Sequence, residues 1–248
     1  MRKIFYSLLL AAVFVAGVAF AGEGTTLTVD QGMTLLKDGN SRFVAMQLRH
    51  PGVTRARLED TSKNGQKPFA AVLGCADSRV PVETVFDRGI GDLFTVRVAG
   101  NVASGDSVIG SLEYAVGHLH VPLIIILGHT QCGAVGAAVS GAKLEGALVQ
   151  VQKKIEPVAK KVEAEHPDLR DPALTDEVVK QNVLQVSEDL LSASEEIRHL
   201  VKDGAVKIVP AVYNIRTGKV EWLETGKPVA PAGRSSLKEV NAVPTKTI

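Results

Sequence analysis

The sequence lacks a strong charge of either sign and has few aromatic residues. It carries 28 basic and 27 acidic residues among 248, for a formal net charge of +1, and aromatics make up 4% of it. A balanced charge gives no electrostatic reason to expect a nucleic acid or an acidic surface as partner, and scarce aromatics argue against a base-stacking platform. The hydrophobic fraction of 45% is sufficient for a substantial core, and a chain of this length predicts one α/β domain.

Residues 1–21 have the composition of a signal peptide. Arg2 and Lys3 form a basic start, an apolar run extends to Phe20, and Ala19 and Ala21 are the small residues expected before a cleavage site. An uncleaved membrane anchor is the alternative, but no basic stop-transfer cluster follows the run. We therefore expect cleavage after Ala21 and a mature chain that is exported to the periplasm, with no membrane segment.

Cysteine is also scarce, since Cys75 and Cys132 are the two in the chain. In an oxidising compartment, two cysteines are ordinarily suspected of forming one disulfide. Each of these, however, lies within a group of other polar residues, Cys75-Ala-Asp-Ser-Arg79 and His129-Thr-Gln-Cys132, which a structural disulfide does not need. A metal site is therefore the favoured interpretation, and the disulfide remains the alternative.

The hydrophobic pattern predicts strands that alternate with helices. Four apolar runs bounded by turn-forming or polar residues predict buried strands, and a turn at 217–218 predicts an antiparallel edge strand: 69–74, 93–98, 121–127, 206–213 and 219–223. Helical spacing predicts helices that start at Pro81 and Thr175 and others over 106–119 and 133–140; the one from Thr175 ends at Gly204. This alternation predicts a mostly parallel sheet of about four strands plus the antiparallel edge strand, flanked by helices.

The remaining segments are less regular. Residues 27–46 predict two helical pieces with a turn at Gly39-Asn40, and residues 50–68 predict a loop. We thus expect a single domain over 22–224 with an N-terminal helical arm. Residues 225–248, rich in Pro, Gly, Ser and Lys, predict a loose tail.

Both cysteine-containing motifs follow predicted strands of the same sheet. In parallel α/β sheets, ligands bind beyond the carboxyl ends of the strands, so Cys75 and His129 are expected at one edge. Cys, Cys and His are good zinc ligands, and three protein ligands leave a fourth tetrahedral position for water, as in catalytic zinc sites. Cys132 also falls at a helix start, where the dipole favours a thiolate. His118 and His120 flank a helix end and are better interpreted as capping or surface groups.

Asp77 and Arg79 stand two residues apart beside Cys75. The simplest interpretation is a surface ion pair of little energetic worth. Next to a zinc ligand, Arg79 could instead keep Asp77 ionised so that Asp77 accepts a hydrogen bond from zinc-bound water. Asp77 could also occupy the fourth metal position itself and close the site.

The two motifs resemble those of the β-class carbonic anhydrases, Cys-x-Asp-x-Arg at 75–79 and His-x-x-Cys at 129–132. The resemblance extends from about Gly39 to Trp222, and further matching segments occur in order: Gly39-Asn40-Ser41-Arg42-Phe43, Gln66-Lys67-Pro68, Gly91-Asp92-Leu93-Phe94, Gly100-Asn101, Glu113-Tyr114-Ala115-Val116 and Gly128-His129 through Cys132-Gly133. Two cysteines alone would be a weak match, whereas this set is highly specific.

The resemblance implies one Zn²⁺ per chain on Cys75, His129 and Cys132, and reversible hydration of CO2 to bicarbonate and a proton by zinc-bound hydroxide with an Asp77–Arg79 dyad. It also implies a small, mostly apolar substrate pocket at the subunit boundary of a homodimer or larger homo-oligomer. The residues implied to shape that pocket are Gln66, Phe94, Tyr114 and Gly133. Gln66 would donate to bicarbonate, and Gln66, Phe94 and Tyr114 could belong to the same or to the adjacent subunit.

The sequence departs from the family pattern at one point. Some members are inhibited by bicarbonate at a second site built from a Trp, an Arg and a Tyr. Arg97 and Tyr213 match two of those positions, but Phe43 stands at the Trp position. This favours an enzyme without the inhibitory site, which keeps water on zinc at neutral pH. Two alternatives stay open: a zinc hydrolase of CS2 or COS on the same scaffold, and a non-catalytic exported protein with a Cys75–Cys132 disulfide.

Overall fold

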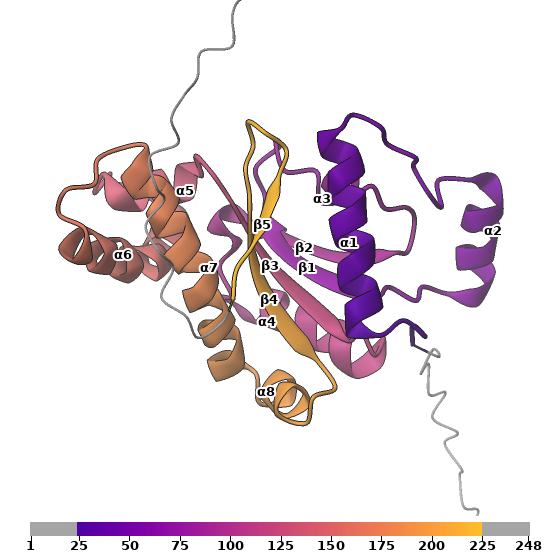
Figure 1. Cartoon of the computed structure of the whole chain (residues 1–248). Helices are drawn as coiled ribbons and strands as arrows, with labels where there is room; N and C mark the ends of the chain where they lie inside the picture. The colour runs from indigo at the N-terminus through magenta and orange to yellow at the C-terminus, as the bar shows by residue number, and fades with distance from the viewer. Residues whose placement is uncertain (1–23, 225–248) are drawn as a thin grey trace, which may run out of the picture.

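A computed structural model of the chain describes residues 24–224 (Figure 1). The expected signal peptide and C-terminal tail lie outside these residues. The described part is built on a five-stranded sheet of order β2-β1-β3-β4-β5, in which β1 to β4 are parallel and β5 is antiparallel to β4. The strands are β1 Ala70–Cys75, β2 Leu93–Val98, β3 Leu123–His129, β4 Lys207–Tyr213 and β5 Val220–Trp222. The predicted fold class is therefore confirmed.

Helices cover both faces of the sheet. Alternate side chains of β1 enter two separate cores, because successive residues of a strand point to opposite faces. Ala71, Leu73 and Cys75 pack toward one core, and Ala70 and Val72 toward the other. The first core is closed by α4 Asp106–Glu113, α5 Gly133–Val139, α6 Leu148–Glu165, α7 Ala173–Ala193 and α8 Glu195–Lys202. The second is closed by α1 Val29–Val44 and α3 Val82–Val85, on the other side of the sheet in Figure 1.

The N-terminal segment differs from its prediction, because α1 runs without a break through Gly39 and Asn40. A side chain at position 39 would come within 1.8 Å of the Phe86 carbonyl oxygen, so glycine is required for close packing rather than for a turn. The Asn40 amide donates to Val85 and Gly218 carbonyls at 3.2 and 2.8 Å and accepts from the Val220 amide at 2.9 Å. Asn40 thus links α1 to α3 and to the start of β5.

Three further predictions, one of a loop and two of helices, are corrected. The predicted loop over 50–68 contains α2, Arg55–Asn64, which Thr54 caps and which buries none of its residues. The long helix expected to end at Gly204 is divided into α7 and α8, because Ser194 leaves helical geometry and its hydroxyl accepts from the Ile197 amide. The helix predicted over 106–119 is α-helical to Glu113 and continues as a π-helical turn, η2 Tyr114–His118. No pattern had predicted α6.

Within the described part of the chain, none of the helices combines the length and the apolar character that crossing a bilayer requires.

Candidate metal centre

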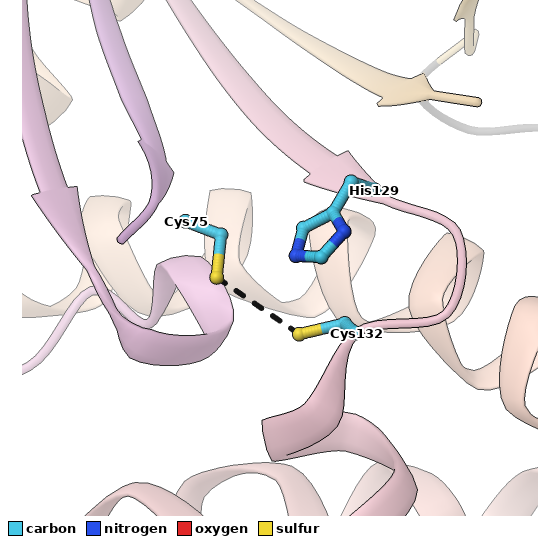
Figure 2. A group of neighbouring side chains, drawn as sticks. All are labelled: Cys75, His129 and Cys132. Carbon is cyan, nitrogen blue, oxygen red and sulfur yellow. Dashed lines mark hydrogen bonds between the residues drawn. The ribbon is translucent and has the colours of Figure 1, made fainter. Parts of the chain in front are cut away.

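The structure brings Cys75, His129 and Cys132 together at the carboxyl ends of β1 and β3 (Figure 2). These strands are adjacent and parallel, so their ends meet, and Cys132 follows in the turn that leads from β3 into α5. The two sulfurs and one imidazole nitrogen all lie within 4.8 Å of one another, and their residues are 4%, 0% and 3% exposed for Cys75, His129 and Cys132. Both cysteines are free, with their sulfurs 4.0 Å apart, whereas a disulfide bond is about 2 Å long.

The His129 ring leaves one nitrogen for a ligand from outside the chain. Its Nδ1 lies 3.0 Å from the Thr130 carbonyl oxygen and donates to it, which leaves the lone pair on Nε2. Nε2 is one of two buried side-chain nitrogens or oxygens that have no hydrogen-bond partner within residues 24–224. Because such unsatisfied groups are rare in folded proteins, this nitrogen points to a missing ligand.

The cluster fits a zinc ion. Two Zn–S bonds of about 2.3 Å at a tetrahedral angle place their sulfurs roughly 3.8 Å apart. The observed separation of 4.0 Å is close to that value. The backbone carbonyl behind Nδ1 also fixes the ring orientation, which is the usual arrangement behind a metal-bound histidine.

The two cysteines share their protons unequally. The contact with Cys132, together with the Gly100 amide at 3.4 Å from the sulfur, lowers the pKa of Cys75, against the effect of burial. The same contact, with burial, raises the pKa of Cys132. The protein thus stabilises one thiolate, and a metal ion would have to displace the second proton.

Asp77 and Arg79 form the expected pair beside the cluster. Arg79 Nε and Nη2 lie 2.9 and 2.7 Å from the two carboxylate oxygens, and its backbone amide donates to Oδ1 at 2.9 Å. These donors, led by the Arg79 side chain, hold the pKa of Asp77 well below its usual range. Asp77 Oδ2 is also 3.8 Å from His129 Nε2, so the ionised carboxylate stands at the edge of the metal cluster.

Further hydrogen bonds hold the two loops that carry Cys75 and Cys132, and the sequence had not predicted these contacts. Arg79 Nη2 donates to the Gln131 carbonyl at 3.2 Å, and the Gln131 amide donates to Asp176 at 3.2 Å. Gln131 has a left-handed backbone with φ of 56°. Asp176 lies in the first turn of α7, where an acidic residue signals a helix start and gives no hint of this contact. Arg97, on β2, donates to backbone carbonyls on either side of Ala76.

An apolar pocket of about 260 Å³ is lined by Gly133, the residue after Cys132, although the three cluster side chains are not among its lining residues. Gly133 is also one of the residues that the sequence predicted for a substrate pocket, a role that stays a prediction. The other lining residues come from η1 (Ala99–Asn101), from α5, and from α6 with the loop before it: Ala99, Ala134, Ala137, Leu144, Leu148, Val151 and Gln152. The pocket is small and carries one polar side chain, so it suits a small uncharged molecule.

The other residues implied for the substrate pocket lie at the opposite end of the sheet. Phe94 pairs with Ala71, about 13 Å before Cys75 along β1. Gln66 precedes β1, and the Tyr114 ring, 6.0 Å from that of Phe94, belongs to a residue that is 46% exposed. A single chain therefore does not bring Gln66, Phe94 and Tyr114 to the metal cluster.

Of the remaining candidates, Tyr213 pairs with His129 in the β3–β4 ladder, and Arg97 contacts the Cys75 carbonyl. The His118 ring stacks on Tyr114 with centroids 5.5 Å apart. Phe43 packs against Tyr213 with ring centroids 6.3 Å apart.

A parallel sheet with a buried Cys–His–Cys cluster beyond its central strands defines an α/β protein with a potential metal site. A family model described as carbonic anhydrase matches residues 70–220. The chain is 41% identical over 189 residues to carbonic anhydrase 2 of Mycobacterium tuberculosis, covering 74% of this chain and 87% of that protein. It is 38% identical over 193 residues to a carbonic anhydrase of Mycolicibacterium smegmatis, covering 75% and 89%.

Solved structures agree. A β-carbonic anhydrase of Aspergillus fumigatus superposes with a TM-score of 0.65 at 26% identity, covering 79% of this chain and 92% of that one. A structure described as a tetrameric β-carbonic anhydrase of Sordaria macrospora shares the fold, with a TM-score of 0.65 at 23% identity and coverage of 77% and 96%. The chain therefore belongs to the carbonic anhydrase family of enzymes and, within it, to the β class.

Proposed function

We propose that this chain is a zinc-dependent enzyme that hydrates CO2 reversibly to bicarbonate and a proton. The observation that carries the proposal is the buried His129 Nε2, which lies close to two cysteine sulfurs and has no hydrogen-bond partner in the described part of the chain. Cys75, His129 and Cys132 would hold the metal. Bound zinc supplies a Lewis acid that activates water near neutral pH.

The chain's own residues would position the reactants. Asp77, kept ionised by Arg79, can accept a hydrogen bond from the attacking water at Oδ2 and orient it. The apolar pocket beside Gly133 suits CO2, which is small and uncharged, and excludes competing water. Because CO2 offers little binding energy, rate must come from this positioning.

The test is a paired measurement on one preparation purified without chelator, namely metal content and CO2 hydration by stopped flow. About one zinc per chain with hydration activity is expected. Asp77→Asn should keep the metal and lose most of the turnover, and Cys75→Ser should lose the metal. Protein without metal or titratable thiols would contradict the proposal, as would sulfide release from CS2 or COS without CO2 hydration.

We also propose that the enzyme works as a homo-oligomer in which each zinc pocket is completed by the adjacent subunit. Support comes from the exposed Tyr114 and from Gln66, both at the far end of the sheet from their own metal cluster. The Sordaria relative is described as tetrameric.

Subunit complementation tests this arrangement. Cys75→Ser and Gln66→Ala chains should each be impaired, and refolding them together should recover activity, because mixed oligomers pair an intact metal cluster with an intact Gln66. Recovery no greater than the average of the two variants would contradict a pocket shared between subunits.

Finally, we propose that the enzyme acts outside the cytoplasm, in the periplasm, after removal of residues 1–21. The basic start, apolar run and small residues of that segment support this. Cell fractionation and N-terminal sequencing that begins at Gly22 would agree with it, and a cytoplasmic full-length chain would not.

A further inference from the structure

Arg97 lies on β2 opposite Gly74 and extends its side chain to the loop that leaves β1. Its Nε donates to the Cys75 carbonyl at 3.0 Å and its Nη2 to the Asp77 carbonyl at 2.6 Å. One guanidinium thus holds two backbone oxygens two residues apart, one on a metal-cluster residue and one on the residue that pairs with Arg79.

This role differs from that of Arg79. Arg79 binds the side chain of Asp77 and the carbonyl of Gln131, whereas Arg97 binds the backbone of Asp77. The last backbone contact of the β1–β2 ladder is Ala76 N to Val98 O at 3.1 Å, so the chain leaves the sheet at the point that Arg97 spans. A planar guanidinium with several fixed donors can hold two acceptors in one geometry, which the point charge of a lysine cannot.

We propose that Arg97 is a positioning residue for the metal centre, which fixes the backbone from Cys75 to Asp77 so that sulfur and carboxylate keep their relative placement. This inference rests on the proposed function. Residues that orient metal ligands from the layer behind them typically change metal affinity or activity about 10- to 100-fold when they are replaced.

The test compares Arg97→Met and Arg97→Lys with the wild type and with Arg198→Met. Arg198 is a matched control, because it is also exposed and donates to a backbone carbonyl, that of Leu191 at 2.9 Å, but lies on α8 before β4, at the other end of the sheet. The readouts are zinc transfer from the loaded protein to a chromophoric chelator, the absorption spectrum of the Co²⁺-substituted protein, CO2 hydration, and thermal unfolding of the metal-free protein.

We expect Arg97→Met to release zinc about 10- to 100-fold faster and to lower kcat/KM by a similar factor. Its cobalt bands should be altered, and its metal-free unfolding should resemble that of Arg198→Met. Arg97→Lys should show only part of each loss. If Arg97→Met does not fold, Arg97→Lys is the variant in which zinc release and the cobalt spectrum are measured.

Zinc release and a cobalt spectrum like those of the wild type in Arg97→Met would overturn the proposal, as would full recovery in Arg97→Lys or equal losses in Arg198→Met. The proposed function fails separately, if the wild-type chain itself binds no zinc; the positioning role then fails with it.

Discussion

The protein buries two polar clusters, one around Asp87 and one formed by Cys75, His129 and Cys132. They differ in whether their polar atoms all have hydrogen-bond partners. Asp87, 1% exposed, accepts from Arg42 Nε at 2.6 Å and from the backbone amides of Arg49 and His50 at 3.1 and 2.9 Å. The Cys75–His129–Cys132 cluster is equally buried, yet His129 Nε2 has no hydrogen-bond partner among the described residues. A cluster that the chain completes with its own atoms stabilises the fold, whereas one that the chain leaves incomplete is built for a ligand.

The two clusters also differ in how they shift the pKa values of their ionisable groups. Burial alone would raise the pKa of Asp87, but the Arg42 ion pair and the two amides outweigh it and hold that pKa below its usual value. At the Cys75–His129–Cys132 cluster, the contact between the two sulfurs lowers the pKa of Cys75 and, with burial, raises that of Cys132, so a bound metal would have to displace the Cys132 proton.

The largest effect is expected from replacing His129, which should remove both metal binding and activity. His129→Ala should abolish metal binding and reduce CO2 hydration to background, because one of three metal ligands is lost. If zinc is present at about a thousand times its Kd, its loss should also remove ~4 kcal/mol of folding free energy. Metal analysis, stopped-flow hydration and thermal unfolding check this. Metal-stripped wild type is the control and should unfold like the variant; zinc retained by His129→Ala would contradict the assignment.

The next effect concerns stability alone. Asp87→Ala should destabilise the fold by about 3–5 kcal/mol, because it leaves the Arg42 charge and two backbone amides without their acceptor. Urea unfolding of the metal-free protein measures it. Zinc content per folded chain should stay at the wild-type level, and a variant that unfolds at the wild-type urea concentration would show that the cluster contributes nothing.

A pH series sharpens the interpretation of Asp87. Because its folded pKa lies below the unfolded value of about 4, its contribution is fully present above that value. It is lost as pH falls through the folded pKa. The stability difference between wild type and Asp87→Asn, from urea midpoints of metal-free protein, should therefore be constant from neutral pH to about 5 and shrink in acid. A difference that grows on acidification would have the wrong sign.

The smallest effect is expected from replacing Asp176, which contacts the loop that carries Cys132. Asp176→Asn should weaken zinc binding by about tenfold, because the neutral amide accepts less strongly from the Gln131 amide and allows the Cys132 loop to move. Chelator competition measures the affinity. Asp203→Asn, an exposed carboxylate at the end of α8, is the control. Equal affinities in both variants would remove Asp176 from the metal centre.

Much of the site could be predicted from the sequence, because it depends on local patterns. The apolar runs at 69–74 and 121–127 predicted β1 and β3, and parallel neighbours end at one edge, so Cys75 and His129 were expected together. The prediction of a turn at Gly39 and Asn40 was wrong because the role of these residues depends on a tertiary contact and not on a local pattern. Glycine in a helix signals a break, and only contact with Phe86 shows that it is there for close packing.

The contacts behind the ligands could not be predicted in this way. Arg97 reaches Cys75 across 22 residues, and Asp176 reaches Gln131 across 45. Neither distance corresponds to a helical or strand period, and both depend on which elements become neighbours in space.

The sequence by itself determined the chemistry of this protein, namely two thiols and an imidazole placed directly after or close to strand ends, with an acid–base pair beside them. Only the tertiary structure decided how that chemistry is held, because the strand order β2-β1-β3 places Arg97 against the Cys75 loop. It also decided that Gln66, Phe94 and Tyr114 lie at the other end of the sheet from their own metal cluster. Side-chain periodicity is a property of a few neighbouring residues, whereas strand order and the distance between sheet ends arise from the packing of the whole domain.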